Sequence, residues 1–76
     1  MEVQIFTTDT CTACAAAKQF FKSKNVNFRE RNVQHDEIAL REMIEKSNSY
    51  SVPVIEIDGN VVIGFDKRRI AELIGI

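Results

Sequence analysis

The sequence predicts an α/β fold in which a four-stranded mixed sheet carries helices on both faces. Apolar and polar residues alternate in two short stretches and two more short stretches are apolar runs, as in strands, and apolar residues recur every three to four positions in three longer stretches, as in helices. A helical stretch separates the first two strands, which is typical of a parallel pair joined by a right-handed crossover. Asp58-Gly59 lies between two apolar runs and predicts a β-hairpin, so the last two strands are antiparallel.

The element order is β-α-β-α-β-β-α, within a single domain of residues 1–76. We expect strands at 2–6, 26–31, 52–57 and 61–63, and helices at about 12–24, 37–46 and 67–74. The polar stretch 7–10 holds N-cap candidates for the first helix, and Asp36 and Asp66 are the expected caps of the second and third. Asn25 fits the end of the first helix.

Each helix has an apolar stripe that we expect to face the sheet. The residues predicted to be buried are Cys14, Ala17 and Phe21 with Ala16 and Phe20 beside them in the first helix, Ile38, Leu40, Met43 and Ile44 in the second, and Ile70, Leu73 and Ile74 in the third.

Composition excludes several classes of function. The chain has 76 residues, of which 45% are apolar and 28% charged, and a net charge of -1, as in a compact domain without a basic field for nucleic acid. No apolar run is long enough to span a bilayer, and the first residues lack a secretory signal. We therefore expect a cytoplasmic monomer with neither a nucleic-acid nor a membrane partner.

Cys11 and Cys14 form a CxxC motif between the first strand and an alanine-rich helix, and they are the only cysteines. A helix start offers free N–H groups and the positive end of the helix dipole, so a thiol placed there ionises more easily. The thiolate is the attacking species in disulfide exchange, and a second thiol one turn away can resolve the mixed disulfide.

Two other interpretations of the cysteine pair are weaker. A structural bridge between Cys11 and Cys14 would close a very short loop and would stabilise the fold little. A closed zinc site usually has four Cys or His ligands, and the chain offers these two cysteines and His35. The pattern therefore favours redox chemistry without a bound metal.

The residues then resemble a known family. Ile5-Phe6-Thr7, the CxxC at 11–14, Ser51-Val52-Pro53-Val54, Asp58-Gly59 and Ile63-Gly64-Phe65-Asp66 occur in the order and spacing of glutaredoxins. The resemblance covers essentially the whole chain and is greatest to short bacterial glutaredoxin-like redoxins of minimal thioredoxin fold.

This resemblance implies roles for the matching positions. Cys11 would be the exposed nucleophile, Cys14 the buried resolving thiol, and Thr12 would belong to the substrate-binding set. Val52 would precede a cis peptide bond to Pro53, and its backbone would pair with the cysteinyl part of glutathione. The turn Gly64-Phe65-Asp66 would present backbone N–H groups to the γ-glutamyl carboxylate at a helix start.

Three positions depart from the usual glutathione-binding pattern of the family. Thr8-Asp9 stands where many members have a lysine, Thr12-Ala13 replaces Pro-Tyr, and Gly64-Phe65 replaces a double glycine. The last change resembles redoxins that take electrons from thioredoxin reductase. Asp9 itself is interpreted as a loop or capping residue.

The expected function is that of a dithiol oxidoreductase that reduces protein disulfides or glutathione mixed disulfides, with glutathione as co-substrate and no bound cofactor. One alternative is a redoxin that thioredoxin reductase reduces and that serves ribonucleotide reductase or another reductase. A second is an iron–sulfur or metal carrier in which Cys11 thiolates of two chains share a cluster. A third is a module that binds extended peptides beside Pro53.

Overall fold

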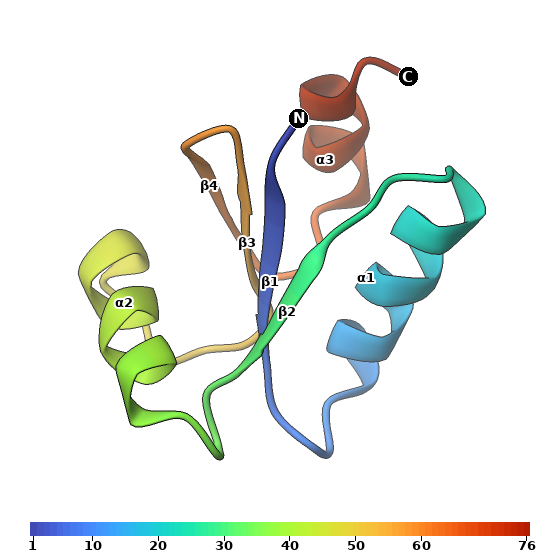
Figure 1. The fold of residues 1–76 in the computed structure, drawn as a ribbon. Coiled ribbons are helices and arrows are strands. Elements are labelled where there is room, and N and C mark those ends of the chain that lie inside the picture. The colour runs from blue at the N-terminus through green and yellow to red at the C-terminus, as the bar shows by residue number, and fades with distance from the viewer.

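The computed structural model describes residues 1–76 and contains one four-stranded sheet, in the order β2-β1-β3-β4 (Figure 1). The elements are β1 Val3–Thr7, α1 Thr12–Ser23, β2 Arg29–Asn32, α2 Glu37–Ser47, β3 Val54–Ile57, β4 Asn60–Ile63 and α3 Lys67–Ile74. β2 runs parallel to β1, whereas β3 is antiparallel to both β1 and β4. The predicted element order and the mixed sheet are confirmed.

The helices form two layers, with α1 and α3 on one face of the sheet and α2 on the other (Figure 1). Because side chains alternate across a strand, neighbouring residues of β1 serve different cores. Ile5 belongs to the larger core under α1 and α3, and Phe6 belongs to the smaller core under α2. None of the three helices is long and apolar enough to cross a membrane.

β2 begins three residues later than predicted and β3 two residues later. The first partner of β2 on β1 is Gln4, which pairs with Arg29, so residues 26–28 precede the ladder. Val26 and Phe28 instead pack on the larger core as partly buried side chains. β3 begins at Val54 because the preceding residue is a proline, which has no N–H to donate to a ladder.

Two predicted core residues are wrong. Asp36 caps α2 by accepting a hydrogen bond from the Ala39 amide, and from that start Ala39 and Met43 point into the smaller core. Ile38, about 100° round the helix from Ala39, is 69% exposed. In α1 the buried stripe passes through Cys14, Ala17, Phe20 and Phe21, and Ala16 is exposed.

The predicted cap of α3 and the predicted end of α1 are confirmed. Asp66 caps α3 through the Arg69 amide, at 3.1 Å. Asn25 follows the C-cap of α1 with a φ of 57°, in the left-handed region that asparagine tolerates.

Truncation of Met43 tests how strongly the smaller core holds α2. Met43 is fully buried, so Met43→Ala should lower the free energy of unfolding by about 2–4 kcal/mol through lost contacts and a residual cavity. Ile38→Ala, on the same helix, should change it by less than about 0.5 kcal/mol. Urea unfolding of both variants measures the difference. Similar losses for the two would contradict this packing.

Candidate functional site

Cys11 and Cys14 lie between β1 and the first turn of α1, and they form a disulfide with a Cα–Cα distance of 5.2 Å. Cys11 itself is the N-cap of α1, because its sulfur accepts a hydrogen bond of 3.1 Å from the Cys14 amide. The sequence placed the cap in the polar stretch before it, so that expectation is wrong. A sulfur therefore occupies the place where a side-chain oxygen usually accepts one of the free N–H groups in the first turn of a helix.

The two sulfurs differ in access. The Cys11 residue is half-buried and Cys14 is 1% exposed, within the buried stripe of α1. When the pair is reduced, the N–H and the helix dipole both favour negative charge on the Cys11 sulfur. A disulfide of another molecule can reach only the Cys11 sulfur directly. Once a mixed disulfide has formed there, the Cys14 sulfur can attack the Cys11 sulfur of that bond.

A second segment reaches this end of the sheet from β3. The register pairs Val54 with Phe6, which brings the start of β3 beside the carboxyl end of β1. The Val52–Pro53 peptide bond is cis, as expected. The Val52 side chain packs on the smaller core, and its N–H and C=O have no hydrogen-bond partner in the chain. A free donor and acceptor beside the disulfide are suited to pairing with an extended substrate.

A third segment, the turn from β4 into α3, is bound to the second. The Gly64 N–H donates to the Pro53 carbonyl at 2.8 Å. Gly64 has a φ of 80°, a conformation that glycine adopts without strain. Phe65 is half-buried and contacts the Phe20 ring edge-on at 5.8 Å between centroids.

The strand registers thus bring the three segments that carry the predicted site residues to one end of the sheet, where β1 leads into Cys11, β3 starts after Pro53 and β4 ends before Gly64 (Figure 1). Thr12 is the exposed first residue of α1, directly after Cys11, and Asp66 is the exposed cap of α3. No three side chains of His, Cys, Asp or Glu gather as ligands of a metal ion.

A set of contacts that the sequence did not predict holds the loop before the cysteines. The Asp9 carboxylate accepts from the Asn32 amide at 2.8 Å and bonds His35 Nε2 at 2.6 Å, and the Asp9 N–H donates to the Gln34 side chain at 3.0 Å. The bond from His35, and then that from Asn32, lowers the pKa of Asp9. Asp9 is a loop residue, as interpreted, and its carboxylate is directed at the β2–α2 connection.

A second unpredicted network lies under α1. Thr7 is the only buried residue with a hydroxyl, amide or charged side chain, and its hydroxyl donates to Glu30 Oε2 at 2.8 Å. Lys18 Nζ donates to the same oxygen at 3.0 Å. Lys18 is one helical turn beyond Cys14, so this network joins the end of β1, β2 and the helix that bears the thiols.

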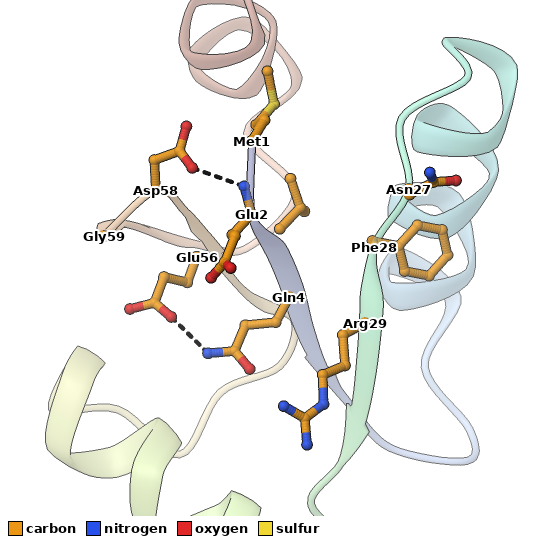
Figure 2. A pocket seen from close by; sticks show the side chains of 10 residues that line it. Met1, Glu2, Gln4, Asn27, Phe28, Arg29, Glu56, Asp58 and Gly59 are labelled. Atoms are coloured by element: carbon orange, nitrogen blue, oxygen red, sulfur yellow. Dashed lines mark hydrogen bonds between the residues drawn. The ribbon is translucent and has the colours of Figure 1, made fainter.

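The largest hollow in the surface is elsewhere. It has a volume of about 750 Å³ and lies at the amino end of β1, away from the cysteines. Two hydrogen bonds cross it: the Gln4 side chain donates to Glu56, and the Asp58 carboxylate accepts from the backbone N–H of Glu2 (Figure 2). It contains none of the predicted site residues.

The Glu30 contacts make stability depend on pH. Hydrogen bonds from Lys18 and then Thr7 hold the pKa of Glu30 below its ordinary value of 4.5. The unfolded chain therefore takes up this proton first as the pH falls, and the stabilisation is present above pH 4.5 and lost as the pH falls through the lower, folded pKa. Urea unfolding from pH 6 to 3 should show the wild type converging on Glu30→Gln at low pH.

Glu45→Gln is the matched control, because the Glu45 carboxylate makes no hydrogen bond or ion pair. Its stability should follow the wild type across the same range. A constant difference between wild type and Glu30→Gln at every pH would contradict the role given to the carboxylate.

Known sequences carry the same pattern. The glutaredoxin family model matches residues 3–62. The chain is 43% identical over 72 residues to an uncharacterised glutaredoxin-like 8.6 kDa protein in the rubredoxin operon of Clostridium pasteurianum, covering 95% of this chain and 96% of that one. It is 38% identical over 64 residues to glutaredoxin 3 of Escherichia coli K12, covering 84% of this chain and 77% of the relative.

Solved structures agree. The T8A mutant of the thioredoxin-like protein BC3987 superposes with a TM-score of 0.94 at 32% identity, over 99% of this chain and 96% of that one. The glutaredoxin-like protein NrdH-redoxin of Escherichia coli gives 0.84 at 25% identity, over 96% and 95%. The matched family, the fold and the CxxC at the start of α1 together show that this chain belongs to the glutaredoxin family, as a thiol–disulfide oxidoreductase of thioredoxin fold.

Proposed function

We propose that the protein reduces disulfides of other proteins, and mixed disulfides with glutathione, through a dithiol cycle at Cys11 and Cys14. The observation that carries this proposal is the asymmetry of the pair: Cys11 is reachable and accepts the Cys14 N–H at 3.1 Å, and Cys14 is buried one turn away. Such a pair has one thiol to attack and one to resolve.

The cycle begins with the reduced pair. The Cys11 thiolate attacks one sulfur of the substrate disulfide, the substrate S–S bond breaks, and the departing sulfur takes up a proton as a thiol. The Cys14 thiolate then attacks the Cys11 sulfur of the mixed disulfide and releases the second substrate sulfur. Two electrons have passed to the substrate, and the 11–14 disulfide has formed.

Val52 and the turn before α3 would position the substrate. The free Val52 N–H and C=O can pair with an extended backbone next to the disulfide. The N–H groups of Phe65, Asp66 and Lys67 make no hydrogen bond within the chain, and they lie at the start of a helix, where an anion is favoured. They are the groups expected to receive a carboxylate of glutathione.

Glutathione would return the pair to the reduced state. One glutathione thiolate attacks the 11–14 disulfide, forms a mixed disulfide on Cys11 and frees Cys14. A second glutathione thiolate attacks that mixed disulfide and leaves as oxidised glutathione. No bound cofactor is required for these two exchanges.

A second candidate has the same dithiol chemistry with a different reductant, thioredoxin reductase, and delivers electrons to ribonucleotide reductase or another reductase. Two observations favour it. Thr8-Asp9 stands where many members of the family have a lysine for a glutathione carboxylate, and the Asp9 carboxylate there carries a negative charge held by its bonds to His35 and Asn32. The likeness to NrdH-redoxin spans nearly the full length of both chains.

Serine variants of the two cysteines test the assignment of roles. Cys11→Ser should reduce both activities to the uncatalysed rate, because no other thiol can be reached from outside. Cys14→Ser should keep the exchange of a glutathionylated peptide and lose reduction of a protein disulfide, which needs the resolving thiol. Assays with these two substrates distinguish the variants; the reverse pattern would exchange the assignments.

The reductant can be tested by changing the charge at position 9. Asp9→Lys should raise glutathione-linked turnover about fivefold over Asp9→Asn, since one exposed ion pair contributes up to about 1 kcal/mol. Asp9→Asn is the control because both substitutions remove the bonded carboxylate. Oxidised protein is supplied separately with glutathione and with NADPH and thioredoxin reductase. Turnover with the flavoenzyme alone would contradict the glutathione proposal and support the second candidate.

A further inference from the structure

The near-neutral net charge conceals an uneven distribution of charge. Residues 12–24 and 66–74, which form α1, α3 and their ends, contain six of the ten basic residues and two of the eleven acidic ones. The rest of the chain has four basic and nine acidic residues. The basic residues of the first layer are Lys18, Lys22, Lys24, Lys67, Arg68 and Arg69. Since α1 and α3 cover the same face of the sheet, this face is basic (Figure 1).

Several of these charges have no partner in the folded chain. Lys22, Lys24 and Lys67 are exposed, and none lies within 4.0 Å of a carboxylate oxygen. The ammonium groups of Lys24 and Lys67 lie 5.8 and 5.6 Å from the centroid of the same ring, that of Phe20. Two like charges, from the C-cap of α1 and the first residue of α3, therefore lie beside one aromatic ring.

The start of α3 adds to this imbalance. Its first three residues are basic and its first turn has no acidic residue, so the N-cap Asp66 is the one carboxylate that complements the helix dipole there. Arg68 and Arg69 both share the single carboxylate of Glu72, at 4.0 and 3.6 Å. An acidic group from outside would offset the excess positive charge beside Phe20.

The basic surface begins at the edge of the redox site and extends far beyond it. Phe20 contacts Phe65, which follows the glycine that bonds the Pro53 carbonyl. Lys24 is 13 residues beyond Cys11 on one helix, which is about 20 Å at 1.5 Å per residue. A tripeptide spans at most about 11 Å. Glutathione held at Cys11 and at the start of α3 therefore does not extend along α1 to Lys24, whereas a protein segment does.

We propose that the surface formed by Lys24 and Lys67 around Phe20, with Arg68 next to Lys67, docks an acidic segment of the protein whose disulfide Cys11 attacks. The inference rests on the proposed reduction of protein disulfides and specifies its substrate class: disulfides flanked by Asp- and Glu-rich sequence. Charge complementarity of this kind raises association rates by roughly 10- to 1000-fold and is screened by salt.

The probes are three synthetic peptides with the same internal disulfide and eight flanking residues at each end, acidic in one, basic in the second and uncharged in the third. At about 20 mM salt, kcat/KM for the acidic peptide should exceed that for the basic peptide about tenfold or more. At about 300 mM salt the ratio should fall to about two or less. Equal rates for the three peptides at low salt would overturn the proposal.

Two double variants with the same change in net charge locate the surface. Lys24→Glu/Arg68→Glu should lower kcat/KM for the acidic peptide about tenfold and raise it for the basic peptide. Arg29→Glu/Arg41→Glu, which places the same charges on exposed residues outside the α1–α3 layer, should change either value by less than about twofold. Equal effects of the two double variants would place the attraction in the overall charge and overturn the docking surface.

A small uncharged disulfide, bis(2-hydroxyethyl) disulfide, separates this inference from the proposed function. Both double variants should reduce this compound at the wild-type rate. That result would also show that their redox site is folded. If the wild type reduces this compound and all three peptides without preference, the docking surface is wrong and the oxidoreductase proposal stands. If it reduces the small compound but no peptide, protein-disulfide reduction fails and the inference fails with it.

Discussion

The pairing of β1 on both of its edges is the constraint on which the site depends. Its parallel ladder with β2 requires a crossover helix, and that crossover places the start of α1 just beyond the carboxyl end of β1. Its antiparallel ladder with β3 begins at Phe6 and Val54, so the cis peptide of Pro53 arrives at the same end. β4, antiparallel to β3, returns to that end and leads into α3. Three segments distant in sequence therefore meet because one central strand sets both registers.

The local chemistry follows from what each segment leaves unbonded at that end. A helix start has N–H groups without intrahelical partners, and α1 uses the Cys11 sulfur to accept one of them. β3 begins only after Pro53, so the backbone N–H and C=O of Val52, the residue before the proline, lie outside the ladder. The start of α3 leaves further N–H groups free after Gly64. The same incomplete hydrogen bonding that would weaken an ordinary helix or strand end gives this site its places for a thiolate, a backbone and an anion.

Most of the fold could be predicted because its signals are local. Period-two stretches, the Asp58-Gly59 turn and the caps at Asp36 and Asp66 each lie within a few residues, and the CxxC with its surrounding motifs indicated the site. The errors and omissions have non-local causes. Ile38 satisfies an apolar pattern, but the helix start fixed by Asp36 turns it to solvent. The start of β2 depends on where β1 begins, which residues 26–28 do not encode. Asp9 with His35, and Thr7 with Glu30, join residues 26 and 23 positions apart, and only the β1–β2 ladder brings them together.

The distribution of charge over the surface is the property that composition predicted least well. A net charge of -1 gave no sign of a basic surface, yet the sum is small because the basic α1–α3 layer is offset by an acidic excess in the rest of the chain. The fold gathers the positive charge by placing two basic helices on the same face of the sheet. Selection for stability alone would pair these charges, since Lys24 and Lys67 have no carboxylate partner and basic residues at the start of α3 oppose the helix dipole. A dithiol that must find particular disulfides among many gains from such a field, because steering acts on encounter and leaves the exchange chemistry at Cys11 unchanged. A helix surface that extends about 20 Å along α1 from Cys11 can therefore recognise the substrate protein. The end of the sheet stays a general site for any disulfide that reaches it.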